Sequence, residues 1–251
     1  MRLFAIGDLH LAASVDKPMA IFGKRWENHV EQIRDKWTST VGADDTVLVA
    51  GDISWANSLE EALPDLTFLD QLPGHKILLR GNHDYWWATM RKNQDFCQAH
   101  DLLTLDFLRN DALEAAGFHI CGSRGWLLPT DEAFTESDRK VFKREMIRLD
   151  LSLQSLARLR KKDDVKRPAL ALMHYPPLDE KGRPSDFCRL LEEAGVEVCL
   201  FGHIHHRAPY YESRPLLGGI RYIMVASDQL RFKPLLIGEE GQFADLAPKE
   251  T

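Results

Sequence analysis

Short, almost wholly apolar runs alternate with longer segments of mixed character along most of this chain. Five of the runs are about five residues long, which is typical of strands buried on both faces of a sheet. We expect these strands at residues 2–6, 46–50, 76–80, 169–173 and 198–201. A hairpin is predicted after Asn110 with its turn at Ala116-Gly117, and residues 219–226 and 234–238 indicate later strands, expected to be antiparallel.

The longer segments carry apolar residues three or four positions apart, a spacing that places them on one face of a helix. The longest predicted helix covers residues 137–161, with Phe142, Leu149 and Leu156 on one stripe. Others are expected at residues 26–37 and 59–69, and from Asp84 toward His100. A short helix is predicted from an N-cap at residue 185 or 186 to a C-terminal glycine at 195.

Alternating strands and helices predict an α/β fold, and the later strands predict that its sheets are mixed. The 251 residues contain no internal repeat, low-complexity segment or linker. A chain of this length can form one large core. We therefore expect a single domain spanning residues 1–251.

The charge balance narrows the classes of partner. The formal net charge is −6, whereas nucleic-acid-binding proteins usually show a basic balance or a basic stripe. The nearest basic run, residues 158–162, lies at the end of the longest predicted helix, where cations interact favourably with the helix dipole. We favour that helix-end role over a binding patch, and nucleic acid is a disfavoured partner.

The cysteines and the apolar runs bear on the compartment. Cys97, Cys121, Cys188 and Cys199 form no C-x-x-C pair, which argues against a zinc ribbon or a disulfide framework and favours free thiols in a reducing compartment. No signal peptide is evident, and no apolar run approaches the ~20 residues needed to span a membrane. We expect a cytoplasmic protein without a membrane partner.

Side chains that can bind metal follow each of the five buried runs. In chain order they are Asp8 and His10, then Asp52, then Asn82, His83 and Asp84, then His174, and finally His203 and His205. Ligands of α/β sheets bind at the carboxyl ends of the strands, so these side chains converge on one edge if the strands share a sheet. Residues two apart on an extended segment point the same way, which pairs Asp8 with His10 and His203 with His205.

Each of these residues alone has an ordinary structural explanation. Asp84 could be the N-cap of the next helix, and Asn82 could be a turn former. Coincidence at five strand ends is improbable, so we interpret the set as a metal site. Imidazoles and carboxylates without thiolates suit Mn, Fe, Zn, Co or Ni. Seven good ligands favour two ions that share a carboxylate, an arrangement that promotes phosphate-ester hydrolysis.

The order of these motifs resembles the calcineurin-like metallophosphoesterase family. The matching blocks are Asp8-x-His10, Gly51-Asp52, Gly81-Asn82-His83-Asp84, His174 and Gly202-His203-x-His205. The wider sequence, including Tyr85-Trp86-Trp87 and Ser123-Arg124-Gly125-Trp126, is similar to a bacterial subgroup of the family. The resemblance implies a four-layer sandwich of two mixed β-sheets flanked by helices, with a dimetal site at the carboxyl ends of the strands.

The resemblance also implies a role for each site residue. One ion would be held by Asp8, His10, Asp52 and His205. The second would be held by Asp52, Asn82, His174 and His203, with Asp52 bridging the two. His83 would touch the phosphate and protonate the leaving oxygen, while a hydroxide between the metals would be the nucleophile. Two divalent or trivalent transition-metal ions are implied, with Mn²⁺ favoured over Fe, Zn, Ni and Co.

One departure from the family bears on the substrate. The family's protein serine/threonine phosphatases usually carry an arginine shortly after the Gly-Asp block, whereas residues 53–56 here are Ile-Ser-Trp-Ala. This disfavours a protein phosphatase and favours a phosphodiesterase or pyrophosphatase acting on a small organic substrate. A nuclease is an alternative that the acidic balance disfavours. A non-catalytic scaffold is an alternative that the complete ligand set disfavours.

Several residues near the motifs are candidates for substrate contact. Aromatic side chains there could pack on a nucleobase or a lipid-like leaving group, although core packing is favoured for Trp86 and Trp87. The aromatic candidates are Trp55, Tyr85, Trp86, Trp87, Trp126 and Tyr175. Arg124 is expected to bind a distal phosphate or to form a surface salt bridge. His206 should point away from His205, so we exclude it from the ligand set.

Overall fold

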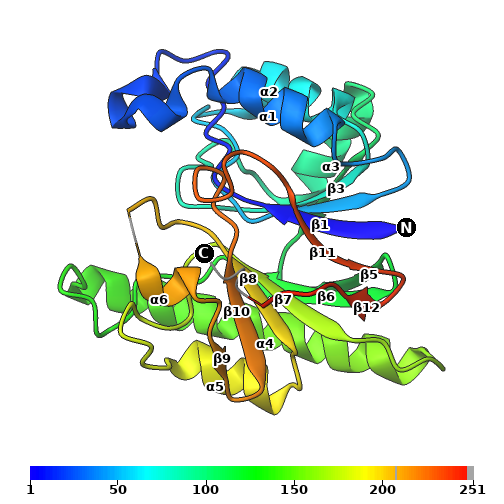
Figure 1. The fold of residues 1–251 in the computed structure, drawn as a ribbon, viewed down its shortest axis with the longest axis vertical. Coiled ribbons are helices and arrows are strands. Elements are labelled where there is room, and N and C mark those ends of the chain that lie inside the picture. The colour runs from blue at the N-terminus through cyan, green and yellow to red at the C-terminus, as the bar shows by residue number, and fades with distance from the viewer. Residues whose placement is uncertain (207, 248–251) are drawn as a thin grey trace.

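Two mixed sheets of six strands each form the centre of the molecule (Figure 1). The computed structural model describes residues 1–206 and 208–247. The first sheet has the strand order β12 (Gln242–Phe243), β11 (Leu235–Glu239), β1 (Arg2–Ile6), β2 (Thr46–Val49), β3 (His75–Leu79) and β4 (Leu105–Leu108). The second has the order β5 (Ala112–Ala115), β6 (Phe118–Ser123), β7 (Ala169–Met173), β8 (Val198–Phe201), β10 (Ile220–Met224) and β9 (Leu216–Leu217).

Helices cover the outer face of each sheet, which gives four layers (Figure 1). The first sheet is covered by the 3₁₀ helices η1 (Met19–Phe22) and η2 (Lys24–Trp26) and by α1 (His29–Thr38), α2 (Leu59–Gln71) and α3 (Met90–Ala99). The second is covered by α4 (Glu136–Lys162), α5 (Asp186–Glu193) and α6 (Pro209–Glu212). The expected α/β sandwich of two mixed sheets flanked by helices is confirmed.

Successive side chains along each strand point to opposite faces of the sheet and pack into separate apolar cores. In β1, Phe4 and Ile6 pack toward α1 and α2, whereas Leu3 and Ala5 pack into the core between the two sheets. In β7, Leu170 and Leu172 enter the same central core from the opposite side. Because both faces of these strands are covered, nearly every position is apolar, and this is why the strands stand out in the sequence.

The strand predictions hold within one residue for all five buried runs, and the hairpin is found as β5 and β6. The five runs do not share one sheet, however. β1, β2 and β3 lie in the first sheet and β7 and β8 in the second, because the chain leaves the first sheet after β4 and starts the second with the hairpin. The prediction of antiparallel later strands is correct for β11 beside β1. It is wrong for β10 beside β8, since the chain crosses over through α6 and returns parallel.

The helix predictions differ from the structure mainly at one N-terminus. The N-cap role considered for Asp84 is wrong, because α3 begins at Met90 and its cap is Thr89, whose side chain accepts from the backbone N–H of Lys92. Ser185 caps α5 as expected. The guanidinium of Arg160, near the end of α4, donates to the carbonyls of Ala194 and Gly195, so this part of the basic run has a structural partner.

Two further predictions concern the cysteines and the membrane. Cys97, Cys121, Cys188 and Cys199 are buried and unpaired, as expected. Among residues 1–206 and 208–247, no helix combines the length and the apolar character needed to cross a bilayer.

Candidate metal centre

The candidate ligands lie where the carboxyl ends of the two sheets meet. β1, β2 and β3 run parallel, and Asp8, Asp52 and Asn82 follow their carboxyl ends, while His174 and His203 follow the carboxyl ends of β7 and β8. Hydrogen bonds join the two sheets at this edge. The backbone N–H of His203 donates to both carboxylate oxygens of Asp8 (3.0 and 3.1 Å), and Nδ1 of His174 donates to the Ala50 carbonyl (2.9 Å).

The side chains form two groups, each able to surround one ion. The first contains Asp8, His10 and His205, and the second contains Asp52, His174 and His203, with the ligand atoms of each group within 4.8 Å of one another. In the first group Nε2 of His10 lies 3.3 Å from Nε2 of His205. In the second group Nε2 of His174 lies 3.5 Å from Oδ1 of Asp52.

Asp52 lies between the two groups. Its Oδ1 faces His174, while its Oδ2 is 3.9 Å from Nε2 of His10. Asn82 joins the second group through Oδ1, which is 2.6 Å from Nε2 of His174. The grouping is the one that the family resemblance implies, with Asp52 in the bridging position; that these residues bind ions stays a prediction.

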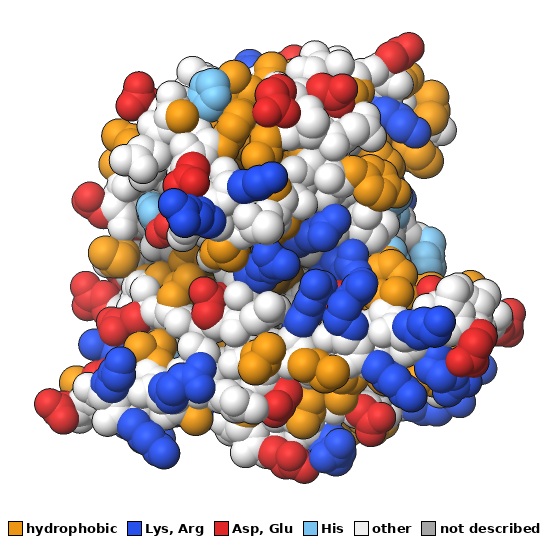
Figure 2. Space-filling model, turned by 180° about the vertical axis from the view of Figure 1, so that it is seen from behind, with side chains coloured by type: hydrophobic (Ala, Val, Ile, Leu, Met, Phe, Trp, Pro, Cys, Tyr) orange, Lys and Arg blue, Asp and Glu red, His pale blue; other side chains and the backbone are white. Residues whose placement is uncertain are grey.

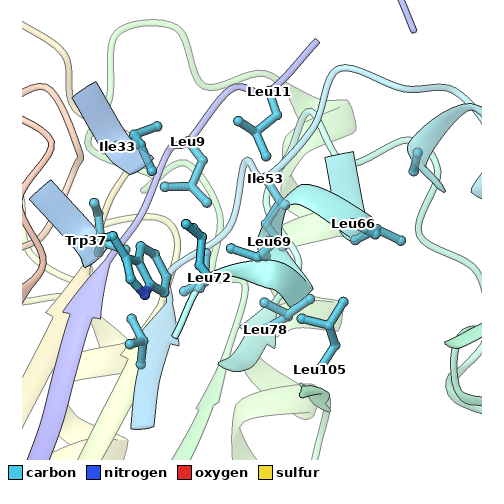
Figure 3. Close-up of a cluster of buried hydrophobic side chains, with 14 of the residues drawn as sticks. Leu9, Leu11, Ile33, Trp37, Ile53, Leu66, Leu69, Leu72, Leu78 and Leu105 are labelled. Atoms are coloured by element: carbon cyan, nitrogen blue, oxygen red, sulfur yellow. The ribbon is translucent and has the colours of Figure 1, made fainter. Parts of the chain in front are cut away.

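Apolar anchors and strained backbone fix these ligands. Leu9 and Ile53, next to His10 and Asp52 in the chain, point into the core below α1 and α2 (Figure 3). Four ligands have the left-handed backbone conformation, with φ values of 55° at Asp8, 49° at His10, 50° at Asp52 and 73° at His203. That conformation is costly for residues other than glycine and clusters at functional sites.

Glycines make room for two of the carboxylates. A Cβ at Gly81 would collide with the Asp52 carboxylate, and a Cβ at Gly202 would collide with the Asp8 carboxylate. Gly81 and Gly202 are therefore required by close approach, in addition to any turn they form.

The electrostatics of the site fit bound cations. Burial raises the pKa of Asp8 and of Asp52, and the nearby Asp52 charge also raises the pKa of Asp8. Burial lowers the pKa of His174 to about 3 and that of His203 to about 2. The neutral His174 donates its one proton to Ala50, so its Nε2 and the Asn82 oxygen face each other as two acceptors. Metal cations suit this set of nitrogen and oxygen donors.

Partners behind the ligands orient the histidines. Nδ1 of His205 lies 3.1 Å from the buried Asp228, which is itself 3.2 Å from the guanidinium of Arg25. Nε2 of His29 donates to the carbonyl of His10. The Asp228 contact is of the kind that fixes the tautomer and the ring orientation of a metal-binding histidine, whereas the His29 contact holds the backbone of His10. Asp228 was not among the predicted site residues; the one local signal was its place after a predicted strand, because its contact with His205 depends on the parallel pairing of β10 with β8.

Asp84 is a structural residue of the site. It is fully buried, and its carboxylate accepts from the backbone N–H groups of Ile53, Ser54 and Gly81. Burial, with the nearby Asp52 charge, raises its pKa to about 7. Asp84 thus ties together the loops after β2 and β3, each of which carries a ligand.

His83 and a cavity lie beside the ligands. The cavity has a volume of about 480 Å³, and His10, Asp52, His83, His203 and His205 line its metal side. The backbone N–H of His83 donates to Oδ1 of Asp52 (2.8 Å), and its ring lies 4.2 Å from the Trp55 ring between centroids. Burial lowers the pKa of His83, whose buried Nδ1 has no hydrogen-bond partner among residues 1–206 and 208–247.

The structure places the other candidates for substrate contact in different surroundings. Trp86 and Trp87 are buried in the first core, as favoured, whereas Tyr85 is 59% exposed. The Tyr175 ring lies 4.0 Å from that of His203, and Trp55 lines the cavity. The surface salt bridge considered for Arg124 is wrong, because its partner Glu145 is buried and Arg124 also packs against Trp126. His206 bonds to Glu180 at 2.6 Å.

Comparisons with known proteins agree with this architecture. The family model for the calcineurin-like phosphoesterases matches residues 1–207. The gene 66 protein of Mycobacterium phage L5 is 41% identical over 58 residues, and this match covers 23% of the chain and 28% of that curated relative.

Two solved structures have a similar fold. The protein TT1561 of Thermus thermophilus has a TM-score of 0.53 at 15% identity, with 94% of this chain and 98% of that chain covered. The phosphopantetheinyl hydrolase PptH of Mycobacterium tuberculosis has a TM-score of 0.52 at 16% identity, with 97% and 98% covered.

Proposed function

The chain belongs to the calcineurin-like phosphoesterase family, and from that premise we propose that it is a metal-dependent hydrolase that cleaves a phosphodiester or pyrophosphate bond in a small organic substrate. The observation that carries the proposal is the pair of ligand groups on either side of Asp52. Two ions that share a carboxylate lie close together, and such a pair of ions can clamp the attacking and the leaving oxygen of an in-line displacement.

The ligands divide between the two ions as their grouping suggests. Asp8, His10, Asp52 and His205 would hold the first ion, and Asp52, Asn82, His174 and His203 would hold the second. Nitrogen and oxygen donors without a thiolate favour Mn²⁺, with Fe, Zn, Ni and Co as alternatives. Ions held here would polarise the phosphoryl oxygens and lower the pKa of a bound water.

His83 supplies the proton for the leaving oxygen. Its imidazole lines the cavity next to Asp52, while its backbone N–H holds the Asp52 carboxylate in place. Histidine is the side chain that most often transfers a proton in catalysis, and one positioned against the leaving group typically contributes 10²–10⁴-fold to the rate.

The test is a rate comparison on one preparation. The metals are stripped and Mn²⁺ is restored, and the hydrolysis of an aryl phosphodiester is measured beside that of the matching monoester, with Asp52→Asn as the control. We expect metal-dependent cleavage that favours the diester and is far slower in the variant. A fully metal-loaded wild-type enzyme that cleaves neither ester would contradict the proposal.

A nuclease is the second candidate, and one observation favours it. Lys and Arg side chains gather near the middle of the face opposite to that of Figure 1, although the net charge of the chain is −6 (Figure 2). Binding of nucleic acid through Lys and Arg side chains weakens steeply as the salt concentration rises. Titration of single- and double-stranded DNA at low and high salt decides the question, and we expect no binding at physiological ionic strength.

A further inference from the structure

Residues 19–26 form a wall of the metal-centre cavity without belonging to any ligand motif. The segment consists of η1 and η2, which meet at Gly23. The φ of +120° at Gly23 is a conformation that side-chain-bearing residues rarely adopt, so glycine fixes the angle between the two short helices. Met19, Phe22, Arg25 and Trp26 from this segment line the cavity.

One end of the segment is attached to the His83 side of the cavity. The indole Nε1 of Trp55 donates to the sulfur of Met19 (3.3 Å). Trp55 in turn stacks on the His10 ring, with centroids 5.1 Å apart and planes 22° apart, and it contacts His83. Met19 and Trp55 therefore form an apolar surface directly beside the group assigned to the leaving oxygen.

The other end is attached to the His205 side. The Arg25 guanidinium lies 3.2 Å from Asp228 and donates to the carbonyl of His205. Its side chain is nevertheless 46% exposed and lines the cavity. Arginine has five N–H donors in a planar fork, so these contacts hold its orientation and leave donors for an anion.

Phe22 completes the wall between these two ends. Its side chain is 57% exposed even though it belongs to the cavity lining. Covering an exposed aromatic ring with an apolar group is favourable in proportion to the area removed from water. A substrate that enters this cavity can therefore gain affinity by placing an apolar group against Phe22.

We propose that residues 19–26 are the substrate-recognition element of this enzyme. Arg25 binds a phosphoryl oxygen, in a chain that has no arginine after its Gly-Asp block. Phe22 and Met19, together with Trp55, receive a leaving group that is apolar and carries a ring. The proposal rests on the proposed function and narrows its substrate class to phosphate esters of ring-bearing, largely apolar alcohols.

The apolar part is tested by calorimetry on the Mn²⁺-loaded enzyme with three phosphonates, which are not hydrolysed. We expect 1-naphthylphosphonate to bind more tightly than phenylphosphonate, and phenylphosphonate more tightly than methylphosphonate. Phe22→Ala should reduce the advantage of the naphthyl ligand by about tenfold. Ile21→Ala is the matched control, because Ile21 is an exposed neighbour in η1 that does not line the cavity, and it should leave the order and the ratios unchanged.

The charged part is tested by Arg25→Ala with Lys24→Ala as its matched control. Arg25→Ala should weaken the binding of all three phosphonates by about tenfold, the loss of a charge-assisted contact, while Mn²⁺ affinity stays the same. Lys24→Ala should change neither the phosphonate affinities nor the Mn²⁺ affinity. A parallel loss of Mn²⁺ affinity in Arg25→Ala would show that Arg25 only positions His205, and would overturn its phosphoryl role.

Two further outcomes would overturn the apolar subsite: equal affinity of the wild-type enzyme for the three phosphonates, or an unchanged naphthyl advantage in Phe22→Ala. These measurements do not depend on turnover. Failure of the proposed function is separate, since it would appear as an enzyme that binds Mn²⁺ and the phosphonates but cleaves neither the diester nor the monoester.

Discussion

Charged side chains are buried at both ends of the first sheet, and they differ in whether the protein supplies their partners. At the amino end of β3, the buried ammonium of Lys76 donates to the carbonyls of Leu72 and Gly74 and to the hydroxyl of Thr104 (2.6–2.8 Å). At the carboxyl end, the carboxylates of Asp8 and Asp52 are buried among imidazoles whose pKa is mostly depressed.

The difference separates a structural charge from a binding site. A buried charge with a complete set of hydrogen bonds is stable in place, whereas buried carboxylates that face neutral imidazoles are suited to a cation from outside the chain. The strained backbone follows the same division, since Asp8, His10, Asp52 and His203 adopt the left-handed conformation and Lys76 does not. Substitutions at the two ends should therefore act on different properties.

The largest expected effect is that of Asp52→Asn. Loss of the shared carboxylate should lower kcat/KM on the order of 10³-fold, beyond the 10–100-fold typical of partners behind the ligands. The metal-free variant should unfold at a higher temperature than the metal-free wild-type protein, because one of two mutually repelling buried carboxylates is gone while Asn can still accept from His83. Thermal unfolding in chelator, beside the kinetics, measures both. If the metal-free variant is less stable than the metal-free wild-type protein, the proposed difference between the two ends of the sheet is wrong.

Lys76→Met should lower the stability of the protein without affecting the metal centre. Removing the ammonium leaves buried carbonyls without a donor, so the free energy of unfolding should fall by about 3 kcal/mol. The number of Mn²⁺ ions bound and the kcat of the folded enzyme should not change. Denaturant unfolding gives the first quantity and metal analysis the second. Lys92→Met, an exposed lysine of α3, is the control for loss of a positive charge.

These two residues also show what the sequence can predict. The candidate site was predictable because each proposed ligand follows a buried apolar run, and five such coincidences in one chain are hard to explain otherwise. The strands were predictable because both of their faces are covered. Lys76 lies within a predicted strand, but nothing local indicates that its ammonium turns back to the carbonyls of residues 70, 72 and 74.

What could not be predicted depends on contacts between distant segments. Asp228 reaches His205 only because β10 returns parallel to β8, and the local pattern of β10 does not distinguish parallel from antiparallel pairing. Arg25 reaches the same pair from η2, about 200 positions away. The division of the five runs between two sheets likewise follows from chain topology and not from their composition.

Asp228→Asn tests how far the carboxyl end depends on such a distant partner. Asparagine keeps an oxygen for Nδ1 of His205 but loses the negative charge, so the affinity for one of the two Mn²⁺ ions should fall about 10–100-fold. The affinity for the other ion should fall less, since His205 is the one proposed ligand that Asp228 contacts. Competition titration with a fluorescent chelator resolves the two affinities. Asp179→Asn, which removes a buried carboxylate paired with Arg183 away from the ligands, is the matched control.

The smallest expected effect concerns a second satisfied charge at the amino end, Asp45. Its carboxylate accepts from the backbone N–H groups of Arg2 and Gly42 and from the Arg2 guanidinium. Burial alone would raise the pKa of Asp45, but these contacts together hold it below its ordinary value. Asp45→Asn should lower the free energy of unfolding by about 1 kcal/mol at pH 7.

The pH dependence of that loss identifies its origin. A carboxyl group whose pKa is lower in the folded state stabilises the protein fully above the pKa of the unfolded chain, and the contribution disappears as pH falls through the folded value. The difference between wild type and Asp45→Asn should therefore be constant from about pH 5 to 8 and shrink below about pH 4. Asp44→Asn, at an exposed neighbour, should show no such window. A difference that persists unchanged in acid would mean that Asp45 acts through packing and not through its charge, and the amino end would then no longer be an example of a charge stabilised by its partners.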